Sequence, residues 1–402
     1  MIKEIIENAE KELQPFYKQV EDIALYNQEK VLKAFQNNHI ALRHFSGSSG
    51  YGYGDDGRDT LNKLFADIFG AEKAICSPNI VSGTHALTLC LYGVLRPNDK
   101  VLCVTGQPYD TLQDVINGEG NGSLKDFGIS FDYISLKNDT FDYESIAKYL
   151  KCNPSIKMVY LQRSRGYEWR NALTIQQIKS LVDYVREKDF QGCIMLDNCY
   201  GEFIEEREAT EVGVSLMAGS MIKNPGGGIA PTGGYVVGEK KYVDLVANRL
   251  TAPSIGDEVG SYLAGYQLFY QGLFLAPHTV LQAVKGCMLF SKVLTDLGYT
   301  TLPKSFEKPN DIILAIKFND KDKLISFIQN IQENSPIDSF VKAMPWKMPG
   351  YENEVIMAAG CFVQGSSIEL SADAPIKPPY IAYMQGGLTY EHCKIVLSNL
   401  KL

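Results

Sequence analysis

The chain has 402 residues, of which 45% are apolar, and this length allows two domains with a sizeable hydrophobic core. The formal net charge of −8 argues against nucleic acid or an anionic membrane as the main partner, because both require a basic face. The N-terminus lacks the apolar core of a signal peptide, and no segment approaches the roughly 20 apolar residues of a membrane span. We therefore expect a cytoplasmic protein.

The cysteines and histidines point neither to disulfides nor to a metal. Nine cysteines are scattered without a C-x-x-C pair, and an odd number does not suit a disulfide framework. Free buried thiols in a cytosolic protein fit this pattern better. The five histidines do not cluster with cysteines at ligand spacing, so we expect no metal site.

Apolar residues in the first 40 positions recur at three- and four-residue steps, which predicts one or two amphipathic helices with a break near Pro15. A glycine-rich loop follows at 45–60. From there to about residue 275, short apolar runs alternate with helical patterns. The predicted strands are 100–106, 157–164, 192–201 and 233–239, and the predicted helices are 82–95, 174–188 and 241–251. This alternation predicts a mainly parallel sheet covered by helices on both faces.

A long helical pattern at 278–299 leads into a second unit with strands and helices of its own. We expect a strand at 311–318, a helix at 322–332, further strands around 354–364, and a closing helix at 389–402. We place an N-terminal helical arm at 1–45, a large domain at 46–280 and a smaller α+β domain at 281–402.

Polar residues follow the predicted strands, where ligands gather in open α/β sheets. Asp197 ends one strand, Tyr109 follows another, and the segment 82–84 (Ser-Gly-Thr) precedes a helix. Lys223 comes about one helix-plus-strand connection after Asp197. Each has an ordinary structural explanation, since Asp and Ser-Gly-Thr often cap helices and lysines are mostly exposed. Their combination in this order is what predicts a site.

Lys223 lies in the stretch "GSMIKNPGGG", among small and apolar residues and just before three glycines. We expect the glycines to let backbone and ligand come close together. We also expect the neighbours of Lys223 to desolvate its amine and lower its pKa.

"SGTHA", Asp197 at a strand end and the S-x-x-K of "GSMIKNPGGG" together resemble a fold-type I pyridoxal-phosphate enzyme. The chain is most similar to the Cys/Met-metabolism lyases, the cystathionine β-lyase and methionine γ-lyase group, and within it to the aluminium-resistance branch. The motifs that carry the resemblance are "GYGYGDDGRDTL", "VSGTHAL", "QPYDTL", "QRSRGYEWR", "DNCYGEF", "AGSMIKNPGGGIAPTGGY", "QGLFLAPH", "QGSSIELSADAPIKPPY" and "QGGLTYEH". The resemblance implies a mainly parallel, seven-stranded-type sheet sandwiched by helices, with 46–280 binding the cofactor.

The same resemblance implies roles for the residues singled out above. Lys223 would bind pyridoxal 5′-phosphate covalently, as an internal aldimine, and then move the substrate α-proton. Asp197 would pair with the pyridine nitrogen, and Tyr109 would stack on the ring. The expected phosphate ligands are Ser82, Gly83, Thr84 and Ser220, the first three at the start of a helix.

In the resembled lyases, a tyrosine and an arginine of a neighbouring subunit close the phosphate site. Tyr53 and Arg58 are the candidates here, with Tyr51 as an alternative to Tyr53, although the loop also suits a plain glycine-rich connection. With these residues in that role, the protein is a dimer with shared sites, and the usual architecture is a tetramer of two dimers. Ile222 departs from the lyases, which often carry a hydroxyl residue there.

Binding of the substrate carboxylate is where the chain departs most. The lyases use an arginine of the C-terminal domain, because its planar fork grips a carboxylate in two places. The corresponding segment, "SSIELSADAPIKPPY", has no arginine, and Lys377 is its cation. Arg163 is a second candidate, although it and Arg165 equally suit structural ion pairs. Further candidates are Ser366 and Ser367 as helpers, and His85 and His278 as structural residues or catalytic acids.

The leading hypothesis is a pyridoxal-phosphate carbon–sulfur lyase that acts on a sulfur-containing amino acid, by elimination of the cystathionine β-lyase or methionine γ-lyase type. An aminotransferase or a racemase would use the same lysine, aspartate and phosphate ligands. A non-catalytic cofactor-binding protein also remains open because of the missing arginine. "GYGYGDDG" resembles a dinucleotide-binding loop, but it does not follow a clear strand, and this disfavours a nicotinamide-dependent enzyme.

Overall fold

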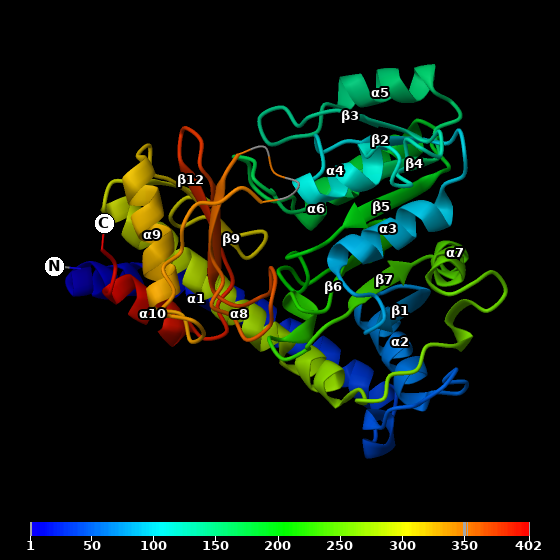
Figure 1. The fold of residues 1–402 in the computed structure, drawn as a ribbon, viewed down its shortest axis with the longest axis horizontal. Helices are drawn as coiled ribbons and strands as arrows, with labels where there is room; N and C mark the ends of the chain where they lie inside the picture. The colour runs from blue at the N-terminus through cyan, green and yellow to red at the C-terminus, as the bar shows by residue number, and fades with distance from the viewer. Residues whose placement is uncertain (1, 349–350, 352, 402) are drawn as a thin grey trace.

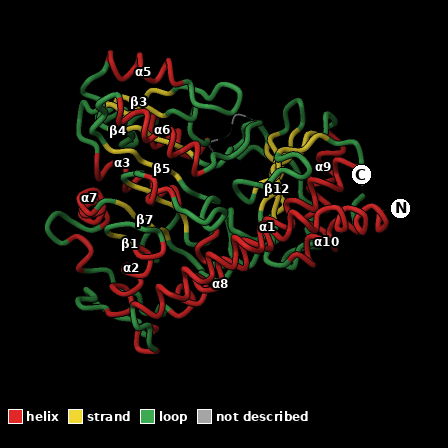
Figure 2. Tube along the Cα trace, turned by 180° about the vertical axis from the view of Figure 1, so that it is seen from behind, coloured by secondary structure: helices red, strands yellow, loops and turns green. Residues whose placement is uncertain are grey.

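The computed structural model describes residues 2–348, 351 and 353–401. Two β-sheets, each with its own helices, lie side by side (Figure 1). Two long helices, α1 (Ile2–Asn37) and α8 (Gln267–Asp296), run next to each other along both parts (Figure 2).

The large sheet has seven strands in the order β1-β7-β6-β5-β4-β2-β3. Its strands are β1 (Lys73–Ser77), β2 (Lys100–Cys103), β3 (Ser130–Tyr133), β4 (Met158–Gln162), β5 (Cys193–Asp197), β6 (Leu216–Ser220) and β7 (Gly234–Gly238). Only β7 runs antiparallel, to both β1 and β6. The predicted mainly parallel sheet is confirmed. Sequence patterning missed β1, β3 and β6, the last of which lies just before Lys223.

Helices cover both faces of this sheet, so its strands are buried on two sides. Val101 and Cys103 of β2 belong to a core with α3 (Gly83–Val94), α4 (Asp110–Asn117) and α7 (Lys240–Leu250). The alternate residues, Leu102 and Val104, belong to a second core. That core includes α2 (Asp56–Ile68), α5 (Tyr143–Cys152), α6 (Ile175–Glu187), α1 and α8. The continuous apolar runs of the strands follow from this two-sided burial.

Helix α1 is continuous over 36 residues and contains Pro15, so the predicted break is wrong. Pro15 is exposed, while Ile6, Ala9 and Leu13 are buried. A proline removes one backbone hydrogen bond, and on the exposed face water can satisfy the carbonyl that is freed. Packing of the opposite face against α8 holds the helix together.

Helix α8 connects the two sheets, and the expected domain boundary near residue 280 falls inside it. By length and composition α8 could cross a membrane, but 67% of its most apolar window is buried within the protein. This is the pattern of a helix in the core of a fold.

The small sheet is antiparallel, with the order β10-β11-β12-β9-β8. Its strands are β8 (Thr300–Leu302), β9 (Ile313–Lys317), β10 (Val355–Ala358), β11 (Ser371–Pro375) and β12 (Ile381–Gln385). Helices α9 (Lys321–Glu333) and α10 (Tyr390–Ser398) pack near it (Figure 1). The expected α+β C-terminal unit is therefore present.

Candidate active site

A cavity of about 420 Å³ lies between the two sheets. We call its two sides the large-sheet wall, which carries Lys223 and Asp197, and the small-sheet wall, which carries Asp373, Tyr383 and Gln385. Seven residues expected at the site line the cavity together: Ser82, Gly83, Thr84, Tyr109, Asp197, Ser220 and Lys223. Ser366 and Ile222 line it as well.

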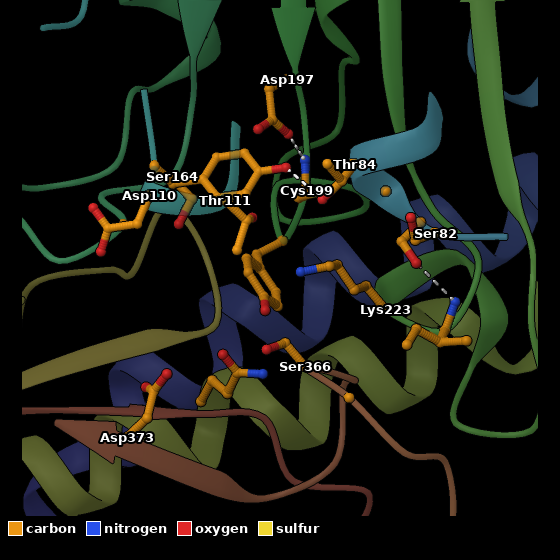
Figure 3. Close-up of a pocket in the computed structure, with 18 of the residues that line it drawn as sticks. Ser82, Thr84, Asp110, Thr111, Ser164, Asp197, Cys199, Lys223, Ser366 and Asp373 are labelled. Carbon is orange, nitrogen blue, oxygen red and sulfur yellow. Dashed lines mark hydrogen bonds between the residues drawn. The ribbon is translucent and has the colours of Figure 1, made fainter. Parts of the chain in front are cut away.

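Lys223 follows β6 and extends into the space between Asp197 and Asp373 (Figure 3). Its Nζ lies 3.6 Å from the centre of the Tyr200 ring. Burial alone lowers the pKa of Lys223, but Tyr200, Cys199 and Asp197 outweigh burial and raise the pKa above its ordinary value. The expected lowering is therefore wrong in the free protein, because folding surrounds the amine with electronegative groups that the local sequence does not show.

The glycines after Lys223 serve the approach of two backbones. Gly227 has a φ of +57°, and a Cβ there would lie 3.1 Å from the backbone nitrogen of Ala276 in α8. A Cβ on Gly272 of α8 would in turn lie 2.9 Å from the carbonyl carbon of Gly226. Our expectation that these glycines bring the backbone close to a ligand is wrong at Gly226 and Gly227. They press the turn after Lys223 against α8, and this fixes the position of the lysine.

Asp197 ends β5 with its side chain toward the cavity and is only 4% exposed. Its Oδ1 accepts a hydrogen bond of 3.1 Å from the backbone N–H of Cys199. Burial raises the pKa of Asp197 despite this hydrogen bond. A buried carboxylate in this setting favours a cationic N–H partner within the cavity.

The N-terminus of α3 forms the side of the cavity beside Ser220. Ser82 is its N-cap, and Ser82 Oγ accepts a hydrogen bond of 3.0 Å from the N–H of His85. A Cβ on Gly83 would lie 3.4 Å from Ser220 Cβ, which shows how closely helix and strand end approach. The first N–H groups of a helix have no partner within it and attract anions. Ser82 thus caps the helix and also lines an anion-binding side of the cavity.

Tyr109 is fixed at both ends. Its backbone N–H donates to Gln162 Oε1 at 2.9 Å, and its hydroxyl shares a hydrogen bond of 2.8 Å with Thr84 Oγ1. Burial raises the pKa of Tyr109, so its phenol stays neutral. The ring is held in one orientation over the cavity, as stacking on a flat ligand requires.

Arg163 and Arg165 lie outside the cavity of Lys223. Arg163 is fully buried and donates to Leu173 O, Gly201 O, Asn198 Oδ1 and Glu205 Oε1. Arg165 donates to Leu302 O at 2.7 Å and lies 4.0 Å from Asp311. Neither lines the cavity of Lys223. The structure favours structural ion pairs and does not support Arg163 as a substrate ligand.

Lys377 lines a second, neighbouring cavity of about 440 Å³ and does not line the cavity of Lys223. Ser367 is buried, and its hydroxyl donates a hydrogen bond to the carboxylate of Glu369. His85 accepts a hydrogen bond from the N–H of Val81, and His278 is exposed on α8. None of these side chains reaches the Lys223 cavity, so the structural interpretation fits both histidines.

The residues expected to serve a neighbouring subunit also lie outside this cavity. Tyr51 and Tyr53 are exposed on the glycine-rich loop, with ring centres 5.7 Å apart. Arg58 is buried at the start of α2, donates to Gly52 O at 3.0 Å and pairs with Asp59. Their role toward a second subunit stays a prediction.

The residues that sequence reasoning missed belong mostly to the small-sheet side: Tyr167, Tyr200, Tyr351, Asp373, Tyr383 and Gln385. Tyr200 lies in "DNCYGEF" and Asp373 in "SSIELSADAPIKPPY", segments already singled out. Asp373 carries a negative charge, whereas the resemblance predicts a cation in that segment. Within the described part of the chain, no group of three metal-binding side chains occurs.

The family model for methionine gamma-lyase matches residues 2–401. The chain belongs to the methionine γ-lyase family. A crystal structure described as a carbon–sulfur lyase involved in aluminium resistance, from Clostridium novyi NT, is 50% identical, with a TM-score of 0.95 over 99% of this chain and 94% of that one. The relationship to the aluminium-resistance branch is thereby confirmed.

Two further comparisons concern a curated sequence relative and a more distant solved structure. The uncharacterised Bacillus subtilis protein YnbB is 47% identical over 98% of this chain and 94% of its own length. Escherichia coli YhfS, described as pyridoxal-5′-phosphate dependent, is 15% identical, with a TM-score of 0.63 over 94% of each chain. At that identity the likeness shows the fold alone, and the fold is that of the fold-type I enzymes.

Proposed function

We propose that this protein is a pyridoxal-phosphate-dependent carbon–sulfur lyase for a sulfur-containing amino acid. The observation that carries the proposal is the buried Lys223, which extends into a cavity that also exposes the buried carboxyl group of Asp197 and the N-terminus of α3. These are an amine that becomes a nucleophile on losing its proton, a buried acid that forms no ion pair among the described residues, and a helix N-terminus that attracts anions. They match the aldehyde, the ring nitrogen and the phosphate of the cofactor.

The fit can be followed residue by residue. Ser82, Gly83, Thr84 and Ser220 would hold the phosphate at the start of α3, while Tyr109 would lie against the ring. Burial makes an unpaired carboxylate at Asp197 unfavourable. Asp197 would therefore form an ion pair with the ring nitrogen and keep a proton on it. Lys223 would hold the cofactor covalently. The bound cofactor supplies an electron sink for the bond broken next to the α-carbon.

Lys223 is also the group placed to move the substrate α-proton. With a substrate bound, the Nζ of Lys223 would be a free amine, and in its neutral form it would accept the proton. The turn held against α8 keeps this nitrogen at the same side of the cavity. Elimination then releases the thiol, and hydrolysis yields a 2-oxo acid and ammonia.

Two further parts of the proposal rest on the family resemblance. Tyr53 and Arg58 would close the phosphate site of a second subunit, which makes a dimer necessary and a tetramer the expected assembly. The exposure of Tyr53 on its loop supports this. We also keep the cytoplasmic location as a prediction.

Borohydride reduction of the cofactor-loaded protein tests the central claim. We expect a pyridoxyl label on the peptide that contains Lys223, and no label in Lys223→Ala. Lys285→Ala is the matched control, because Lys285 also lies over tyrosine rings, 4.7 Å from the centre of Tyr17, yet outside the cavity. A label that persists in Lys223→Ala contradicts the proposal.

Incubation with cystathionine, methionine and cysteine separates the activities. A lyase releases thiol, ammonia and 2-oxo acid, and Lys223→Ala should lose this activity by about 1000-fold or more. An aminotransferase would release no free ammonia. A racemase would form the D-enantiomer of the amino acid as its only new product. A colour change without any product would favour a binding protein.

A further inference from the structure

The charges of the cavity are unusual for a site that takes amino acids. Its charged side chains, within the part of the chain that the structure describes, are Lys223, Asp110, Asp197 and Asp373. Under the proposed function, Lys223 and Asp197 would hold the cofactor and would not be available to the rest of the substrate. The small-sheet wall then presents Asp373, and none of the arginines that the structure describes lines the cavity.

Asp373 is held in place on β11, at the middle of three antiparallel strands. It pairs with Met357 of β10 and with Tyr383 of β12. Its Oδ2 accepts a hydrogen bond of 2.6 Å from the hydroxyl of Tyr167, whose backbone oxygen in turn accepts one of 2.6 Å from Tyr383. The carboxyl group is therefore fixed on the cavity side of the sheet (Figure 3).

Within the described residues, no lysine, arginine or histidine forms an ion pair with Asp373. The side chain is half-buried, and its accessible part opens into the cavity. A carboxylate removed from bulk water in this way is stabilised by a cation that donates hydrogen bonds to it. The partner that the protein lacks is one that a ligand can bring.

The same wall is unsuited to an anion. A carboxylate at this wall would meet the charge of Asp373, while Arg163 and Arg165 are committed to partners in the protein interior. Gln385 is also committed, since its amide donates to Ser367 O at 2.9 Å.

We propose that Asp373 binds a cationic group of the substrate, so that the preferred substrates are thioether amino acids with a second ammonium group beyond the sulfur. This inference rests on the proposed function and names the substrate class of the same site. Tyr167 positions Asp373 and does not itself contact the cation.

The test compares two ligands that differ in one group. S-(2-aminoethyl)-L-cysteine ends in an ammonium, and S-propyl-L-cysteine carries a methyl group in its place. Binding to the cofactor-loaded protein is followed by the change in the visible absorbance of the cofactor, and cleavage is followed by kcat/KM for each compound. We expect the aminoethyl compound to bind at least about tenfold more tightly, the range for a hydrogen bond to a charged group.

Asp373→Asn keeps the shape of the side chain and removes the charge. The preference should fall to about twofold or less, through weaker binding of the aminoethyl compound with little change for the propyl compound. Asp132→Asn is the matched control, because Asp132 of β3 also accepts a tyrosine hydroxyl, that of Tyr149, but lies outside the cavity. It should leave the preference intact.

The outcomes separate the two proposals. If the cofactor band responds to both compounds but the preference is absent in the wild type, or unchanged in Asp373→Asn, the inference about Asp373 is overturned while the lyase proposal stands. Equal weakening of both compounds in Asp373→Asn would assign Asp373 a structural role only. A cofactor band that responds to neither compound contradicts both proposals.

Discussion

The large-sheet wall and the small-sheet wall enclose one cavity, but they are built differently. The large-sheet wall consists of strand ends and a helix N-terminus, so Asp197, Ser220 and the start of α3 meet because parallel strands end at one edge. The small-sheet wall presents side chains from the middle of antiparallel strands, Asp373 and Tyr383. The first wall suits a cofactor that many enzymes share, and the second decides what else can enter.

The largest effect should come from the large-sheet wall. Under the proposed function, Asp197→Asn would remove the charge that holds a proton on the cofactor ring, and we expect the lyase rate to fall by on the order of 100-fold or more. Steady-state kinetics and a thermal melt of the cofactor-loaded variant check this. A melting temperature near that of the wild type with a wild-type rate would remove Asp197 from its role.

Arg163 lies outside the cavity, and its replacement tests whether its role is structural. Arg163→Met should destabilise the fold by about 3 kcal/mol, because it leaves Glu205 without its buried partner. Urea unfolding measures the loss of free energy. At low temperature, the ratio of the affinities for the two thioether ligands should be the same in the variant as in the wild type. An altered ratio would show that Arg163 contributes to substrate binding.

The small-sheet wall should respond to pH. Burial raises the pKa of Asp373 to about 6, against the opposing effects of Tyr167 and Lys223. The groups that face it are Lys223 and the tyrosines at 167, 200, 351 and 383, and the pKa of each tyrosine is raised, so they stay neutral.

Asp373 is therefore a carboxylate above pH 6 and neutral below it. The preference for the aminoethyl compound should be full at pH 7.5 and fall several-fold by pH 5. Titration of the α-amino group affects both compounds alike and cancels in the ratio. A preference that does not change between these pH values, or that changes equally in Asp373→Asn, would contradict the assignment.

The smallest effect is expected outside both walls. Lys377 lines the neighbouring cavity and is exposed, so Lys377→Met should change the binding of either thioether ligand by less than about twofold. A larger loss, shared by both ligands, would show that Lys377 binds the carboxylate they have in common.

Much of the large-sheet wall was predictable because its residues are marked by local pattern. Asp197 ends a predicted strand, Tyr109 follows another, the segment 82–84 precedes a helix, and Lys223 is marked by the S-x-x-K motif. The parallel topology brings such positions together. Local pattern misled where the outcome depends on distant contacts. It placed a break at Pro15, which packing against α8 prevents.

The sequence by itself determined the alternation of strands and helices, the family and most of the large-sheet wall, because periodicity and short motifs are local properties of the chain. Tertiary structure alone decided the pKa of Lys223, the interior position of Arg163 and the exposure of Asp373 to the cavity. Each of these depends on groups brought near from 20 or more residues away, and burial and charge at such distances are set only when the chain has folded.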